Sequence, residues 1–389
     1  MPPLLALAVF NVANSAFFAF LPVYFDHLGL PQPKVAALLS LFPLVGIILA
    51  LPFGVAGDIA LSPKRLSLLG LSTFLVSVLL LKLAGDLWLL IPLLVLVAAS
   101  GGLFGTNCSA VYYKLLGEGG YGRKIGLLSA AVVMSAGLGP LLAGGILKSA
   151  GIGALFPLSF SIALPGVAFV ALMRDVKPVR SSALDYARDF GRREVFALTV
   201  ATFTHAVHMG VETVCLALFM GRHLGLGPEL IGVVFFLNST FFSLGAVYLG
   251  LLSDRRPRPM ALLSLGLLAS GAFNFLMPLA NSFGPLVAVR FFHVTGDSAA
   301  ALARGLLVAS LFPAERRGGG VGLMGLVLPC GMLLGTALCG LFGDYARPFF
   351  VAGAVEVAGV IALLALKPNF PAPSSREAPI PPVHHHQGH

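Results

Sequence analysis

The stretch His27-Leu28-Gly29-Leu30 returns as His223-Leu224-Gly225-Leu226, 196 residues further along the chain. Other matched positions keep the same displacement: Gly54 and Gly250, Asp58 and Asp254, Gly70 and Gly266, Gly126 and Gly322, Gly139 and Gly335, Gly144 and Gly340. One register with no net gap joins all of these pairs, which indicates a tandem duplication. The chain therefore consists of two related halves.

The composition places both halves in a membrane. Of the 389 residues, 57% are hydrophobic and 11% are charged, with a mean hydropathy of +0.94. A soluble domain has about 25% charged residues, so this chain has too little polar surface for a soluble protein. Apolar runs of roughly 20 residues recur throughout, each long enough to cross about 30 Å of hydrocarbon. We predict an all-α membrane protein.

Charged and Gly/Pro clusters divide the chain into twelve predicted transmembrane helices, six in each half. They are expected to begin near Leu4, Val35, Leu66, Leu87, Ile125, Ile152, Val195, Glu229, Pro259, Pro285, Gly320 and Phe349. The predicted organisation is an N-terminal half (1–173), a central linker (174–194), a C-terminal half (195–367) and a disordered tail (368–389). The tail ends in His384-His385-His386-Gln387-Gly388-His389.

The basic residues predict the orientation of these helices. Of the 25 Lys and Arg residues, 19 fall in the set of alternate loops that also holds both termini, and six fall in the other set. By the positive-inside rule, both termini and the linker face the cytoplasm, and the protein resides in the cell's inner membrane. This distribution also accounts for the net charge of +9 without a nucleic-acid partner.

Two short motifs occur at equivalent points of the halves. The first is Gly54-Val55-Ala56-Gly57-Asp58, followed by Lys64 and Arg65; the second is Gly250-Leu251-Leu252-Ser253-Asp254, followed by Arg255 and Arg256. With the two six-helix halves and the charged middle loop, they resemble the major facilitator superfamily. That resemblance implies a twelve-helix transporter in which Asp58 and Asp254 help close the cytoplasmic end of a cavity. The first copy departs from the pattern, because Ile59 stands where arginine is usual.

A third motif lies in the fifth predicted helix, as Gly139-Pro140-Leu141-Leu142-Ala143-Gly144-Gly145. It resembles the Gly-Pro-x-x-Gly-Gly element of proton-coupled efflux members, with Ala143 in place of one glycine. It predicts a smooth, kinkable helix along which the halves could rock. A general packing face of small residues is the alternative.

Ionisable residues at membrane depth form two stripes, both in the second half. One holds His205, His208, Glu212 and Cys215; the other holds Arg290, His293, Asp297 and Arg304. At 100° per residue, each set lies within an arc of about 80° of its helix. In the family that the chain resembles, both helices border the central cavity. Asn11, Asn14, Asn107 and Tyr112 are expected to face the stripes from the other half, and Glu356 has no evident partner.

Charged groups inside a membrane are costly and are therefore candidates for function. One interpretation is proton coupling, in which Glu212 or Asp297 binds a proton and a nearby histidine relays it. A second is a transition-metal site formed by His205, His208, Glu212, Cys215 and His293. A third is a structural network in which nothing titrates. Arg290 opposes the metal interpretation, because a cation repels a metal ion.

The sequence thus predicts a secondary transporter that works by alternating access and is not an enzyme. Proton-coupled efflux of a small molecule is the main prediction, with protons as coupling ion, membrane lipid around a monomer, and no cofactor. Export of a divalent metal or metal chelate is the alternative within transport. A membrane receptor or lipid-handling protein is the alternative outside it.

Overall fold

The computed structural model describes the backbone of residues 2–59, 62–114, 121–174, 191–255, 258–312 and 317–369. Within those ranges it does not describe the side chains at 50–59, 110, 113–114, 121–130, 254–255, 309 and 317–323. The predicted linker and tail lie largely outside the described residues, as do the side chains of Gly54, Asp58, Asp254, Arg255 and Arg256.

The first half consists of helices that pack around a hydrophobic core. They are α1 (Pro2–His27), α2 (Gln32–Ile59), α3 (Pro63–Leu81), α4 (Leu87–Lys114), α5 (Tyr121–Ala150), the short 3₁₀ turn η1 (Ile152–Ala154), α6 (Leu155–Ala163) and α7 (Pro165–Ala171). The last three run on from one another over Ile152–Ala171 and make one apolar span. Within such a span the helix satisfies its own backbone hydrogen bonds, as hydrocarbon requires.

The second half repeats the first. It contains α9 (Arg193–Leu218), continued by the π-helical turn η3 (Phe219–His223), then α10 (Pro228–Arg255), α11 (Pro259–Leu276) with the 3₁₀ turn η4 (Met277–Leu279), α12 (Phe283–Leu311), α13 (Arg317–Cys339) and α14 (Arg347–Leu366). Eleven helical segments among the described residues are long and apolar enough to cross a membrane, and the apolar part of α13, Met324–Cys339, is shorter. The predicted all-helical fold is confirmed, and no predicted helix start differs by more than four residues.

The duplication is visible in the packing as well as in the sequence. Helices α2, α3, α4 and α5 begin 196 residues before α10, α11, α12 and α13. A Cβ added to Gly70 would lie 2.7 Å from Phe104 N, and one added to Gly266 would lie 2.7 Å from Ala300 N, which is the same contact one repeat later. Gly29 and Gly225, with φ of 74° and 66°, end the equivalent helices in the left-handed region that glycine tolerates. The halves therefore share one packing plan.

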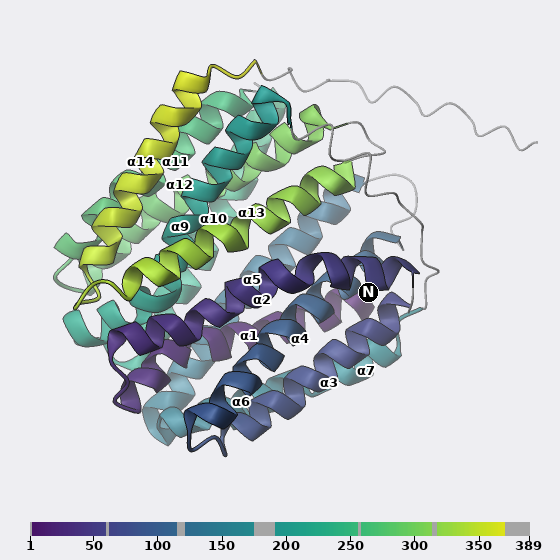
Figure 1. The fold of residues 1–389 in the computed structure, drawn as a ribbon, viewed down its shortest axis with the longest axis vertical. Coiled ribbons are helices and arrows are strands. Elements are labelled where there is room, and N and C mark those ends of the chain that lie inside the picture. The colour runs from purple at the N-terminus through teal and green to yellow at the C-terminus, as the bar shows by residue number, and fades with distance from the viewer. Residues whose placement is uncertain are drawn as a thin grey trace, which may run out of the picture.

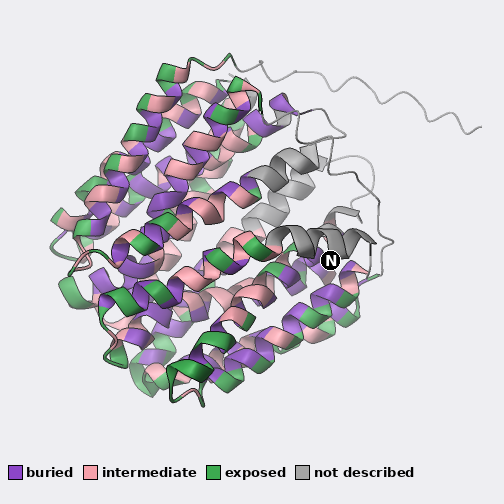
Figure 2. Ribbon diagram, viewed as in Figure 1, coloured by how far each residue is buried: buried purple, intermediate pink, exposed green. Residues whose placement is uncertain are grey.

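The halves form two adjoining bundles, α1–α7 and α9–α14 (Figure 1). The main contacts between them are made by α2 with α13 and by α5 with α10. Exposed residues concentrate on the outer surfaces of the bundles, whereas buried residues lie on the helix faces that point toward other helices (Figure 2). Membrane helices expose apolar residues outward in this way because lipid is their solvent.

Polar contacts join the halves at one end of the molecule, near the loops after α1, α9 and α13. Asp26 Oδ2 accepts from Arg222 Nε at 2.7 Å, and these two residues are 196 positions apart. Gln32 Nε2 donates to the backbone oxygens of Cys339 and Asp344 at 2.9 and 2.8 Å. By the predicted orientation, this end is extracellular.

Candidate functional site

The site begins with one face of α9. His205, His208 and Glu212 follow one another at helical spacing, so their side chains point in the same direction toward α12 and α14. His208 is 1% exposed and Glu212 is 17% exposed as side chains. The predicted stripe is therefore present, and its side chains lie inside the protein.

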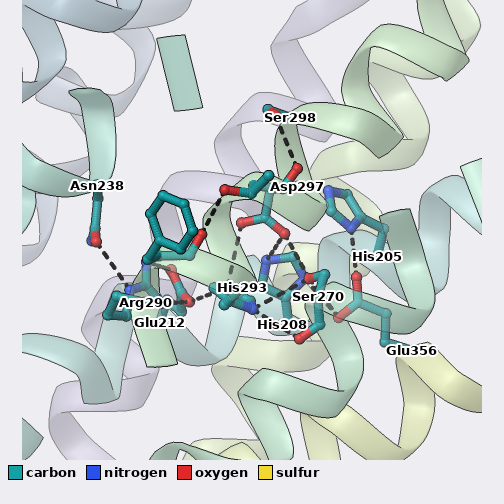
Figure 3. A network of polar contacts seen from close by, with 12 residues as sticks. His205, His208, Glu212, Asn238, Ser270, Arg290, His293, Asp297, Ser298 and Glu356 are labelled. Carbon is teal, nitrogen blue, oxygen red and sulfur yellow. Dashed lines mark hydrogen bonds and ion pairs between the residues drawn. The ribbon is translucent and has the colours of Figure 1, made fainter. Parts of the chain in front are cut away.

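Helix α12 supplies the second stripe, and the two stripes meet (Figure 3). Arg290 makes a bidentate ion pair with Glu212, with Nη1 to Oε1 and Nη2 to Oε2, and its Nε donates to Asn238 Oδ1 at 3.2 Å. His293 Nε2 lies 2.8 Å from Glu212 Oε1 and 3.3 Å from Asp297 Oδ2. Glu212 thus contacts a guanidinium and an imidazole from the neighbouring helix.

The expectation that Glu356 lacks a partner is wrong. His205 Nδ1 lies 2.7 Å from Glu356 Oε1, and Ser270 Oγ lies 3.0 Å from Glu356 Oε2. The Glu356 side chain on α14 is 0% exposed, and His208 Nδ1 lies 3.5 Å from it. Helix α14 packs against both α9 and α11, and this packing brings Glu356 into the cluster.

Ser270 on α11 links the two sides of the cluster, and the sequence did not reveal it. Its hydroxyl lies 2.6 Å from Asp297 Oδ1 as well as 3.0 Å from Glu356, and its backbone oxygen lies 2.9 Å from His293 Nδ1. Serine is common in membrane helices and carries no charge, so only the packing identifies it. Asn238 was missed for the same reason.

A cavity of about 390 Å³ adjoins the cluster. Its polar wall is formed by His205, His208, Glu212, Asp297 and Arg304, and its other lining residues are Phe18, Ala19, Met209, Thr213, Leu216, Ala217, Phe235, Phe242, Ala301 and Met332. Phe18 and Ala19 belong to α1, so both halves border it. Arg290 and Glu356 do not line the cavity and lie behind the residues that do.

The side chains expected to face the stripes from the first half have other described surroundings. Asn11 Nδ2 donates to Leu7 O at 2.8 Å, and Asn107 Nδ2 donates to Leu103 O at 2.9 Å, each within its own helix. Asn14 is half-buried on α1, and Tyr112 packs against the hydrophobic core. None of the four lines the cavity.

Cys215 does not join the cluster, although it shares the face of α9. Its Sγ lies 3.3 Å from Cys339 Sγ on α13. The described groups whose donor atoms could hold a metal are His205, His208, Asp297 and Glu356, and His208, Glu212 and His293. These groups share His205, His208, Glu212 and His293 with the predicted metal set, add Asp297 and Glu356, and do not include Cys215.

The predicted short motifs lie outside the buried cluster. In the basic pair that follows the Gly54–Asp58 motif, Lys64 Nζ donates to Ala171 O at 2.7 Å within the same half, and Arg65 is exposed. The helix element Gly139–Gly145 contacts the other half through Pro140 and Gly144, whereas Gly139 lies against α1 of its own half. A Cβ on Gly144 would clash with the backbone oxygen of Pro228, and Gly145 has open space. Pro140 O lies against Gly232 of α10.

The comparisons with known proteins agree with this architecture. The sequence model of the Major Facilitator Superfamily matches residues 4–210 and again residues 198–386. A search of curated proteins finds no match.

Several solved structures share the fold. A POT family transporter in complex with a thioalcohol-conjugated peptide has a TM-score of 0.79 at 14% identity, covering 94% of this chain and 95% of that chain. A POT family transporter with 5-aminolevulinic acid has a TM-score of 0.77 at 14% identity, covering the same shares. The nucleoside transporter NupG has a TM-score of 0.77 at 11% identity, covering 94% and 99%.

Proposed function

The chain belongs to the Major Facilitator Superfamily of membrane transporters, and we propose that it exports a small solute in exchange for protons. The observation that carries the proposal is the buried cluster of ionisable side chains on the wall of the cavity that both halves border. Apolar side chains in these positions would stabilise the fold at least as well, because each buried charge costs free energy to desolvate. We therefore assign the cluster a role in transport and not only in stabilising the fold.

The charges of the cluster point to bound protons. Glu212, Asp297 and Glu356 are three carboxylates, whereas Arg290 is the one guanidinium or ammonium group in contact with any of them among the described residues. With Arg290 paired to Glu212, Asp297 and Glu356 have imidazoles and a serine hydroxyl as their direct partners, and Arg304 acts on Asp297 only from beyond ion-pair distance. Membrane interiors do not tolerate two uncompensated negative charges, so protons on these groups are the simplest compensation.

The contacts of His293 indicate where one of these protons lies. Its Nδ1 faces the backbone oxygen of Ser270 at 2.9 Å and therefore carries a hydrogen. Its Nε2 faces Glu212 and Asp297 oxygens at 2.8 and 3.3 Å. A lone pair on Nε2 would be repelled by two carboxylates, so the contact needs a proton. We place one exchangeable proton between His293, Glu212 and Asp297.

This proton can be linked to the position of the halves. Glu212 borders the cavity together with Asp297, His205 and His208, while its partner Arg290 is 3% exposed, so a proton can reach Glu212 directly from the cavity. Protonated Glu212 no longer balances Arg290, which favours a different arrangement of α9 and α12. A solute and a proton that prefer different conformations are then coupled.

The direction of export rests on the resemblance of the α5 element to that of proton-coupled efflux members. Gly144 and Pro140 contact α10 of the other half by their backbones, which suits a surface on which the halves rock. The transporters of similar fold include one in complex with a conjugated peptide, one in complex with 5-aminolevulinic acid and a nucleoside transporter, which makes small polar solutes reasonable first probes for this chain.

Accumulation in inside-out proteoliposomes tests the proposal. Vesicles with an acidic interior are offered a labelled dipeptide, 5-aminolevulinic acid, a nucleoside or Co²⁺, and an exporter accumulates its solute. Glu212→Gln and Asp297→Asn should abolish driven accumulation and retain solute exchange. Glu229→Gln is the matched control, because Glu229 pairs with Lys148 outside the cluster. Driven accumulation that survives in both cluster variants contradicts the proposal.

A further inference from the structure

We infer that the transported solute is a divalent transition-metal ion, held by a quartet of side chains composed of His205, His208, Asp297 and Glu356. This inference rests on the proposed transport function and names its substrate class. Each of the four residues offers one donor atom, and these atoms lie within 4.8 Å of one another. Two imidazoles and two carboxylates form a donor set that divalent ions such as Zn²⁺, Co²⁺ and Fe²⁺ favour.

The positive charge of Arg290 does not oppose a metal in the quartet. Arg290 pairs with Glu212 and Asn238, and no contact with a quartet member is among its described interactions. Its charge is neutralised there by Glu212. The quartet itself carries two carboxylates, whose charge matches that of one divalent ion. Arg304 lines the same cavity and interacts electrostatically with Asp297, but no ion pair within 4.0 Å joins the two among the described contacts.

The separations that His208 makes within the quartet suit metal ligands better than hydrogen bonds. His208 Nε2 lies 3.6 Å from Asp297 Oδ1, and His208 Nδ1 lies 3.5 Å from Glu356 Oε2. Both are too long for a hydrogen bond. Donors that surround a tetrahedral ion at about 2.0–2.2 Å are about 3.3–3.6 Å apart. When an ion binds, His208 uses only one of its two ring nitrogens, and the 2.7 Å contact between His205 Nδ1 and Glu356 Oε1 has to lengthen.

An unpartnered nitrogen is the second, independent observation. His208 is 1% exposed, and among the described residues its Nδ1 has no hydrogen-bond partner. Leaving a buried nitrogen unpaired costs free energy. That atom faces the carboxylate of Glu356, as a metal ligand would. Binding an ion would remove the penalty.

Ser270 holds the two carboxylates of the quartet in place. Its Oγ is within 3.0 Å of oxygens of both Asp297 and Glu356. A hydroxyl has one hydrogen and can donate to only one of them at a time. The two carboxylates are therefore held close together with one hydroxyl hydrogen between them. Because the hydroxyl is neutral, their negative charges are left for a cation to compensate.

The cavity gives an ion access to the quartet. His205, His208 and Asp297 line it, while Glu356 is 0% exposed behind them. An ion that enters meets three ligands at the wall and the fourth beneath them. Because Cys215 contacts Cys339 and is not in the quartet, the set has no thiolate, which favours zinc, cobalt or iron(II) over copper(I).

Co²⁺ titration of the purified full-length chain tests the inference, with visible absorption as the readout. The four tail histidines (His384, His385, His386 and His389) are replaced by alanine in every sample. Glu356→Gln and His208→Ala are the test variants, and His223→Ala is the control, since His223 stacks on Phe219 outside the quartet. Zn²⁺ competition then measures affinity without relying on colour.

The inference predicts one Co²⁺ per chain, with absorption bands typical of four- or five-coordinate cobalt. Glu356→Gln and His208→Ala should weaken binding at least tenfold, and His223→Ala should bind as the parent does. Thermal unfolding of each variant shows whether it is folded. Absent or unchanged binding in folded test variants overturns the metal assignment. That outcome leaves proton coupling intact, because driven accumulation of an organic solute that depends on Glu212 and Asp297 would still support it.

Discussion

Removing the guanidinium of Arg290 should destabilise the protein far more than removing both members of its ion pair. Arg290 is 3% exposed and makes a bidentate pair with Glu212 plus a hydrogen bond to Asn238. Arg290→Met preserves most of the apolar stem and leaves the Glu212 carboxylate without its cation. Glu212→Gln leaves the opposite charge unpaired, and the double variant leaves neither.

The structure sets the size of the effect. Breaking a buried pair by removing one partner costs about 3–5 kcal/mol. Glu212 is 17% exposed and borders the cavity, so its stranded charge keeps some hydration and the lower limit applies. About 3 kcal/mol corresponds to a factor of roughly 150 in the unfolding equilibrium, at about 1.4 kcal/mol per tenfold. The double variant should fall within about 1 kcal/mol of the parent protein.

A double-mutant cycle measures this directly by equilibrium unfolding in mixed detergent micelles. The expected coupling energy is at least about 2 kcal/mol, because the double variant is more stable than the sum of the single losses implies. Asn238→Ala serves as a control that removes a hydrogen bond and no charge. Additive losses would refute the reasoning, since they would mean that neither charge depends on the other.

Three further predictions concern packing, closure and orientation. Gly266→Ala should destabilise by about 1–3 kcal/mol, because the new Cβ meets the α12 backbone, whereas Gly250→Ala, with open space around it, should be neutral in the same unfolding assay. Asp26 and Arg222 pair across the two halves at the predicted extracellular end, and this pair is partly exposed. Asp26→Asn should therefore change the population of the conformation closed at that end by less than about fivefold, which spectroscopic distance measurements between the loops after α1 and α9 check. A cysteine at Lys367 should react with a membrane-impermeant maleimide only after cells are permeabilised; reaction in intact cells would reverse the predicted orientation.

Sequence periodicity predicted what depends on single helices. A helix turns by about 100° per residue, and this rotation predicts two polar faces. One is the face of α9 with His205, His208 and Glu212, and the other is the face of α12 with Arg290, His293 and Asp297. Their meeting was expected only by resemblance to a transporter family. The structure adds the ion pair between Glu212 and Arg290 and the contacts of His293.

What periodicity could not predict depends on packing between distant helices. Glu356 lies 151 residues from His205 in sequence, and only the position of α14 against α9 and α11 brings them together. A buried carboxylate in an otherwise apolar helix was itself a signal that a partner must exist. Conversely, Cys215 shares an arc with the histidines, yet that arc is wide enough for its end to contact α13 instead.

The amide side chains of α1 and α4 show a different limit. Asn11 and Asn107 each donate to the carbonyl four residues earlier in their own helix, which a polar side chain in a membrane helix can always do. A polar residue inside a span therefore need not face a cavity. Ionisable residues are better indicators, because a charge cannot be satisfied by one backbone carbonyl.

The central claim is that protons move through the buried cluster during transport, and substrate-evoked proton flux tests it most directly. Proteoliposomes that enclose a pH-sensitive dye, without an imposed gradient, receive each probe solute in turn, including Co²⁺. The account predicts a pH change for the transported solute that is lost in Glu212→Gln and in Asp297→Asn and kept in Glu229→Gln. Solute uptake that proceeds in the parent protein with no accompanying pH change would contradict it.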